Sequence, residues 1–133
     1  MKPHFNHEKL DAYQAALEFA AWAGELLEHL PTKLSVRDQL DRASTSAVLN
    51  LAEGNAKFSL RDRRRYFETA AGSALECAAC LDVLLIRRYL TGEQVEAGKS
   101  KLQRVVLTVM GLIRSLDKQL NEDTPLYEVN GVE

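Results

Sequence analysis

The hydrophobic positions of the chain follow a helical period in four segments, which span residues 7–29, 35–56, 60–89 and 91–121. Apolar residues three or four positions apart lie on one face of a helix and form a stripe that can be buried. In chain order, the expected core positions are Leu10, Tyr13, Leu17, Ala20, Gly24 and Leu27; Val36, Leu40, Ala43, Ala47 and Leu51; Phe67, Ala70, Ala74, Ala78, Leu81 and Leu85; and Leu102, Val105, Val106, Val109, Leu112, Ile113, Leu116 and Leu120. Four such helices with short connections predict an all-α fold, an antiparallel up-down-up-down four-helix bundle.

Short polar motifs mark the expected helix ends. Ser35 is a candidate N-cap of the second helix, which Gly54 and Asn55 are expected to close. Ser59 precedes the third helix as a capping residue, with Asp62 three positions later. The sequence "TGEQ" opens the fourth helix.

The composition is that of an ordinary globular protein, and 133 residues are enough for one core. We expect the bundle to occupy residues 1–121 and residues 122–133 to form a flexible C-terminal tail. The opening "MKPHFNHEKL" lacks the apolar core of a signal peptide, and no apolar run approaches the roughly 18 residues of a membrane span. A cytoplasmic protein without a membrane partner is therefore expected.

A polar ladder runs beside the apolar stripe of the second helix. Its members follow the heptad interval and share one side of a helical wheel: Gln39, Arg42, Ser46, Asn50 and Glu53. A solvated face is the simplest interpretation, but serine and asparagine are poor helix formers that gain most from defined hydrogen bonds. The third helix offers Ser73 and Glu76 as partners, and Gly72 beside them permits a close approach. We predict that the ladder, Ser73 and Glu76 form a connected, largely buried structural network, in which Arg42 pairs with a carboxylate.

The motif "QLDRASTSAVLNLAEG", followed by "AAGSALE", resembles the paired signature of the 23S rRNA intervening-sequence proteins. The matching positions are Gln39, Leu40, Arg42, Ala43, Ser46, Asn50, Ala52, Glu53, Gly54, Ala70, Gly72, Ser73 and Glu76. The early "LDAYQAA" resembles the opening of that family, so the resemblance covers residues 7–118. Two positions depart from the pattern, because Ala47 stands where isoleucine is usual and Arg63 where an aromatic residue is expected.

The resemblance implies an antiparallel four-helix bundle that assembles as a ring-shaped homopentamer. One branch of the family serves as the accessory protein of reverse transcriptases in diversity-generating retroelements, is strongly basic and binds nucleic acid. This chain has a net charge of −2 and departs from that basic character.

Charge is distributed unevenly along the chain. Residues 8–30 carry five acidic side chains against one lysine, whereas residues 60–118 carry eleven basic side chains against seven acidic ones. The molecule is expected to have an acidic and a basic side, which can dock on each other in an oligomer. The net charge argues only against a protein that binds nucleic acid over its whole surface.

The cluster "RDRRRYF" is the strongest candidate for nucleic-acid binding. Its arginines are Arg61, Arg63, Arg64 and Arg65. They crowd the start of the third helix, where the helix dipole disfavours positive charge. Arginine binds phosphate bidentately, and Tyr66 and Phe67 are candidates to stack a base, although Phe67 also fits the core. The alternative is an ion-pair surface that meets the acidic first helix of another subunit.

The sequence does not predict a catalytic or metal site. Cys77 and Cys80 share one helix face without a second cysteine pair or a nearby histidine, so we interpret them as buried hydrophobic residues, with a redox pair as the alternative. Glu53 and Glu76 lack the Glu-x-x-His motif of bundle metal sites. No cysteine or serine of the last three helices has a histidine base, and there is no glycine-rich phosphate loop. We expect no catalytic residue, no metal, no cofactor and no enzymatic activity.

These features favour a non-enzymatic, homo-oligomeric scaffold or accessory protein, associated with an RNA-containing complex. Its expected partners are further copies of itself, five in all by the resemblance, together with RNA or another nucleic acid and a second protein. The alternative is an adaptor that binds only protein.

Overall fold

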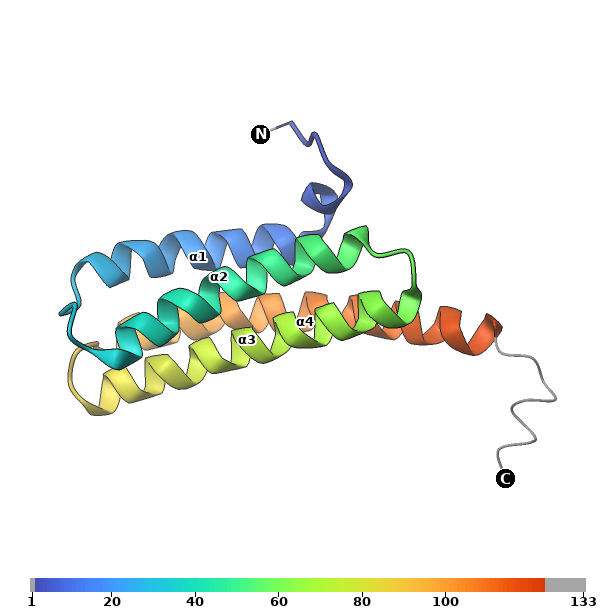
Figure 1. Ribbon diagram of the computed structural model, residues 1–133. Coiled ribbons are helices and arrows are strands. Elements are labelled where there is room, and N and C mark those ends of the chain that lie inside the picture. Colours follow the sequence, from blue (N-terminus) through green and yellow to red (C-terminus); the bar gives the residue numbers. More distant parts are fainter. Residues whose placement is uncertain (1, 124–133) are drawn as a thin grey trace, which may run out of the picture.

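Four α-helices lie side by side and alternate in direction in the computed structural model, which describes residues 2–123 (Figure 1). The helices are α1 (Asp11–Glu28), α2 (Ser35–Ala56), α3 (Leu60–Ile86) and α4 (Gly92–Asp123), preceded by a short 3-10 helix, η1 (Asn6–Lys9). Each helix packs against the next one along the chain, and α4 also packs against α1. The predicted antiparallel four-helix bundle is confirmed.

Two of the expected N-terminal capping motifs are present. The N–H of Asp62 donates to Ser59 Oγ at 3.3 Å at the start of α3. At the start of α4, Thr91 Oγ1 accepts from the N–H of Gln94 at 3.2 Å, and Gln94 Oε1 accepts from the N–H of Thr91 at 2.9 Å. This reciprocal pair is a capping box. The prediction for Ser35 is wrong, because Leu34 is the N-cap of α2 and makes no side-chain capping bond.

Three helix ends differ from the sequence prediction. Helix α1 begins at Asp11, because Leu10 is extended and η1 precedes it as a separate turn. Helix α3 ends at Ile86, because Arg88 adopts a φ of 66° in the left-handed region, which cannot continue a right-handed helix. Helix α4 continues to Asp123, past the predicted boundary at 121. The rest of the predicted tail lies outside the described residues.

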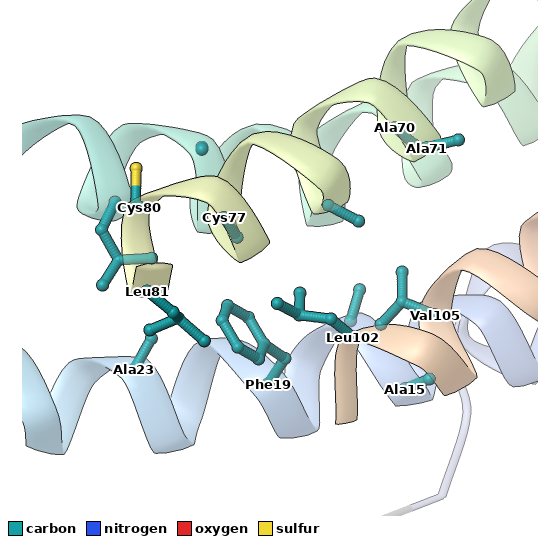
Figure 2. Packing of buried hydrophobic residues seen from close by; sticks show 14 of the residues in the cluster. Ala15, Phe19, Ala23, Ala70, Ala71, Cys77, Cys80, Leu81, Leu102 and Val105 are labelled. Carbon is teal, nitrogen blue, oxygen red and sulfur yellow. The ribbon is translucent and has the colours of Figure 1, made fainter. Parts of the chain in front are cut away.

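The core positions predicted for α2 are all buried, whereas α1 buries a different face from the predicted one. The buried residues of α1 are Ala12, Ala15, Ala16, Phe19, Ala23, Leu26 and Leu27. Those predicted, except Leu27, are half-buried or exposed: Leu10, Tyr13, Leu17, Ala20 and Gly24. Apolar residues occupy most of the circumference of α1. The spacing of these residues therefore does not define which face of the helix points inward. Figure 2 shows the ring of Phe19 between Leu81 of α3 and Leu102 of α4, a fit that selects this face.

Two glycines allow close approaches between helices. A Cβ atom at Gly54 would lie 2.8 Å from the Cβ of Tyr66 and 2.9 Å from the ring of Phe67. A Cβ atom at Gly98 would lie 2.6 Å from the ring of Trp22. Gly54 therefore serves helix packing inside α2, which continues to Ala56, and the prediction that it closes the helix is wrong.

Helix α3 is long and apolar enough to cross a membrane by length and composition alone. Core helices of bundles pass the same test. In this structure α3 packs against both α2 and α4, so the bundle core accounts for its apolar character.

Candidate functional site

The centre of the polar ladder joins α2 to α3. The hydroxyl oxygens of Ser46 and Ser73 lie 2.8 Å apart and share a hydrogen bond. Asn50 Nδ2 donates to Ser46 Oγ at 3.0 Å and to the Ser46 carbonyl at 2.9 Å. Ser73 is buried, and Ser46 and Asn50 are half-buried. These three residues form the connected part of the predicted network.

The other ladder residues lie outside this contact. Gln39, Arg42, Glu53 and Glu76 are all exposed. Arg42 pairs with Asp38 at 3.2 Å, and both side chains are largely exposed. Within residues 2–123, Glu53 and Glu76 make no side-chain hydrogen bond or ion pair. The prediction of one largely buried network is therefore wrong for the single chain, because α2 and α3 meet along the line of Ser46 and Ser73 and leave the outer half of the ladder open.

The outer side of this contact is an open surface, which we call the α2–α3 face. It consists of Arg42, Leu49, Asn50, Glu53, Thr69, Gly72 and Glu76. Leu49 is 58% exposed and lines a depression of about 440 Å³ with Arg42 and Glu53. A Cβ atom at Gly72 would meet nothing within 4 Å. The face thus combines an exposed apolar side chain, charges and open space.

The four arginines at the start of α3 have different surroundings. Arg63 Nε donates to the carbonyl of Lys57 at 2.6 Å and so fastens the loop between α2 and α3. Arg65 pairs with Asp62 at 3.0 Å at the surface. Arg61 is exposed and has no ion pair among the described residues.

Arg64 connects the start of α3 to the end of α4. Its Nε and Nη2 atoms donate to the two carboxylate oxygens of Asp117 at 2.6 and 3.2 Å, and Nη1 donates to Glu68. The hydrogen bond from Arg64 holds the pKa of the Asp117 carboxyl below its ordinary value, and the same bond raises the pKa of Arg64. The structure therefore places Arg63 and Arg64 in internal contacts and leaves Arg61 and Arg65 as the most accessible cations of the cluster.

Neither aromatic residue expected to stack a base is fully exposed. Phe67 is 3% exposed and belongs to the core, as its alternative interpretation predicts. Lys57 Nζ lies over the ring of Tyr66, 5.0 Å from its centroid. A fully exposed aromatic residue, Phe58, lies in the preceding loop, and sequence reasoning missed it. The sequence feature that could have indicated Phe58 is an apolar residue in the short connection between two helices, beside the capping residue Ser59.

Cys77 and Cys80 are buried in the α3 core, as predicted (Figure 2). Burial, followed by the neighbouring Cys80 and Glu76, raises the pKa of the Cys77 thiol to about 12. Burial also raises the pKa of Cys80. Both thiols are protonated near neutral pH and are poor nucleophiles in this state. Among residues 2–123, no group of three histidine, cysteine or acidic side chains is placed to hold a metal ion.

A second open surface, which the sequence did not indicate, lies between α3 and α4. Leu75 and Leu107 are 59% and 62% exposed and border a groove of about 640 Å³. Ala78 and Val106 line it as well. The two surfaces lie on either side of α3.

Comparison with known proteins supports the fold and the family. A family model described as 23S rRNA-intervening sequence protein matches residues 8–111. A crystal structure of a protein of unknown function from the S23 ribosomal protein family of Bacteroides thetaiotaomicron is 24% identical, with a TM-score of 0.73 over 77% of this chain and 97% of that chain. At this identity the likeness establishes the fold alone. A comparison with curated proteins gave no match.

Proposed function

The chain belongs to the family of 23S rRNA-intervening sequence proteins, and from this premise we propose that it is a cytoplasmic, non-enzymatic, homo-oligomeric scaffold or accessory protein of an RNA-containing complex. The family resemblance inferred from the motifs of α2 and α3 is confirmed. The proposal has two parts, self-assembly and RNA association, and each has its own support.

The observation that carries self-assembly is the exposure of the signature residues on the α2–α3 face. Glu53 and Glu76 are charged, exposed and without a partner among the described residues. Arg42 has only the surface pair with Asp38, and exposed pairs of this kind contribute about 0–1 kcal/mol. Next to them stands Leu49, an apolar side chain that gains free energy when it is covered. An adjoining copy that supplies opposite charges and apolar contact would satisfy all of these groups.

The face carries groups of opposite charge side by side. Arg42 precedes Ser46 by one turn of α2, and Glu76 follows Ser73 by about one turn of α3. Because the helices are antiparallel and joined at Ser46 and Ser73, Arg42 and Glu76 stand at similar levels along the bundle. A neighbouring copy that covers both groups with a different patch of its own surface makes a heterologous contact, and repetition of that contact gives a ring when its rotation closes. Five copies are implied by the family resemblance.

Light scattering across micromolar concentrations tests this part. Wild-type protein should have the mass of an oligomer, and Arg42→Glu should dissociate it because like charges then face each other. If a Glu76→Arg change in the same chain restores assembly, Arg42 and Glu76 meet across a two-fold contact of one face with itself, and the heterologous ring is overturned. Arg114→Glu is the matched control, because Arg114 is exposed on α4. A monomeric wild type would overturn self-assembly, whereas dissociation by Arg114→Glu would move the interface to α4.

RNA association is supported by the accessible arginines, Arg61 and Arg65. Each patch is small, but a homo-oligomer repeats it, and linked weak contacts give a combined affinity well above that of one contact. Protein–RNA binding through phosphates weakens as salt rises. The Arg61→Gln, Arg65→Gln double variant should therefore weaken binding to all RNA sequences and lower its salt dependence, while Arg114→Gln should not.

A protein-only adaptor is the second candidate, and the internal contacts of Arg63 and Arg64 favour it. The two candidates differ in one measurement. Wild-type protein is titrated with structured RNA, single strands and duplex DNA at about 50 mM salt. Binding that disappears at higher salt supports the RNA-associated scaffold. Absence of binding to all three probes supports the adaptor.

A further inference from the structure

Phe58 is completely exposed at the turn between α2 and α3. Its two neighbours are fixed by hydrogen bonds. The carbonyl of Lys57 accepts from Arg63 Nε at 2.6 Å, and the N–H of Lys57 donates to the Gly54 carbonyl at 3.2 Å. On the other side, Ser59 Oγ caps α3. The aromatic ring is therefore presented to solvent by a well-anchored turn.

The other strongly exposed phenylalanine has a different environment. Phe5 is 66% exposed, but its ring stacks on that of His7 with centroids 6.1 Å apart. Among the described residues, Phe58 has no ring contact. A fully exposed aromatic ring on an anchored turn is a feature that a binding partner can use, since aromatic side chains contribute large contact areas at low entropic cost.

Basic residues are concentrated in the sequence next to Phe58. Between residues 57 and 65 there are five cationic side chains and one acidic side chain. Arg61, three positions after Phe58, is exposed and has no ion pair within residues 2–123. The side chain of Arg65 is 74% exposed, and its surface pair with Asp62 is weak enough to be exchanged for a phosphate. The turn and the first two turns of α3 thus offer a free ring and two accessible guanidinium groups.

We propose that this turn binds single-stranded nucleic acid, with Phe58 stacking on an unpaired base and Arg61 and Arg65 holding the adjacent phosphates. The inference rests on the proposed RNA association and specifies its ligand as unpaired strands. A single strand presents a planar base face and a phosphate within one nucleotide, and base–aromatic stacking does not depend on sequence. In a duplex the base faces are stacked on each other and are not available to the ring.

The chemistry of the turn fits this ligand better than an anionic membrane. Its two accessible cations, Arg61 and Arg65, are arginines, whose planar guanidinium groups bind phosphates bidentately and stack on bases. Insertion into a membrane needs a wide apolar face, and one aromatic ring between Lys57 and Ser59 does not provide it. A neighbouring copy of the chain is the other possible cover for Phe58, and both alternatives are outcomes of the test.

The test measures fluorescence anisotropy of a labelled single-stranded RNA of about 20 nucleotides and of the duplex formed from it. Wild-type protein should bind the single strand more tightly than the duplex. Phe58→Ala should weaken binding to the single strand by about five- to one-hundredfold and leave the salt dependence unchanged, because stacking involves no counterion release. Phe5→Ala is the matched control and should bind as wild type does.

A second variant gives a direct signal. Phe58→Trp should retain binding, and its added emission relative to the wild type, which contains only Trp22, should be quenched by the single strand and not by the duplex. Because Phe58 has no packing contact to lose, both variants should fold as the wild type does. Circular dichroism and light scattering confirm this before binding is measured.

Several results would overturn the inference and leave the proposed function intact. If Phe58→Ala binds the single strand as tightly as the wild type, while the Arg61→Gln, Arg65→Gln variant binds it more weakly, RNA association stands and stacking is rejected. If Phe58→Ala dissociates the oligomer, the ring is a subunit contact. If the Phe58→Ala variant binds RNA as the wild type does but no longer binds phosphatidylserine vesicles, the turn is a membrane contact. No binding of wild-type protein to any RNA overturns both the inference and the proposed RNA association.

Discussion

Helix α3 meets its two neighbours in different ways. On the α2 side, Gly54 lets Tyr66 and Phe67 come so close that no Cβ atom fits between the helices, and Ser46 bonds to Ser73 in the contact. On the α4 side, Leu75 and Leu107 remain largely exposed along an open groove. Small side chains permit a close, hydrogen-bonded contact, whereas large ones at the edge leave apolar surface uncovered. A single helix therefore makes a close, hydrogen-bonded contact with α2 and borders an open groove with α4.

The polar contacts of the two sides differ as well. The α2 side has neutral hydroxyl and amide groups that are at least half-buried. The α4 side has ion pairs at the surface, Arg64 with Asp117 and Lys99 with Asp82, the latter at 2.6 Å. Water and salt screen exposed charges, so these pairs contribute less than their short distances suggest. The close contact with α2 is expected to contribute more to stability.

The largest expected effect is that of Gly54→Ala. The added methyl group would clash with the Cβ of Tyr66, which moves only with the backbone of α3. Overpacking of this kind costs about 1–3 kcal/mol in the free energy of unfolding, and the higher helix propensity of alanine offsets a part of it. Urea denaturation of the variant and the wild type measures the difference.

Gly72→Ala is the matched control for this change. It makes the same substitution within a helix, but its methyl group meets nothing within 4 Å in the single chain. Where no neighbouring copy contacts Gly72, the change should stabilise the protein by about 0.5–1 kcal/mol through helix propensity. Equal effects of the two substitutions would contradict the difference in packing. Destabilisation by Gly72→Ala would show that another molecule covers the α2–α3 face in solution.

A smaller effect is expected from the hydroxyl pair. Ser73→Ala removes one partner of Ser46 in a buried contact and should lower the free energy of unfolding by about 1 kcal/mol. In a double-mutant cycle with Ser46→Ala, the coupling energy should be about 0.5–1.5 kcal/mol. Ser100→Ala, at an exposed position of α4, is the control. A coupling energy near zero would mean that the contact contributes to helix geometry and not to stability.

The smallest effect is expected at the ion pair of Arg64 and Asp117. Because folding lowers the pKa of Asp117, the pair stabilises the folded state above the carboxyl's ordinary pKa of about 3.9, and this contribution disappears as the pH falls through the lower, folded-state value. The difference in stability between wild type and Asp117→Asn should therefore shrink on acidification and with added salt. Asp41→Asn, which removes an exposed carboxylate, is the matched control. A difference that persists at low pH would mean that Asp117 acts through packing.

The sequence by itself determined the class of fold and the order of its elements. Helical period is a local property, so it indicated four helices, and the capping motifs at Ser59 and Thr91 placed the starts of α3 and α4. The buried stripe of α2 and the core positions of Cys77 and Cys80 also followed from spacing. The motifs of α2 and α3 sufficed to identify the family.

Only the tertiary structure decided which side chains are covered. The packing of the helices selected the inward face of α1, because Phe19 fits between α3 and α4. A helical wheel of α1 alone carries no information about these two neighbours. The packing also divided the polar ladder, burying Ser73 and leaving Arg42 exposed, and it directed Arg64 to Asp117, 53 positions away in the chain. Burial and pairing depend on which helices approach and how closely. The distance between two helices is set by the side chains of both, so the hydrophobic periodicity of one helix does not predict it.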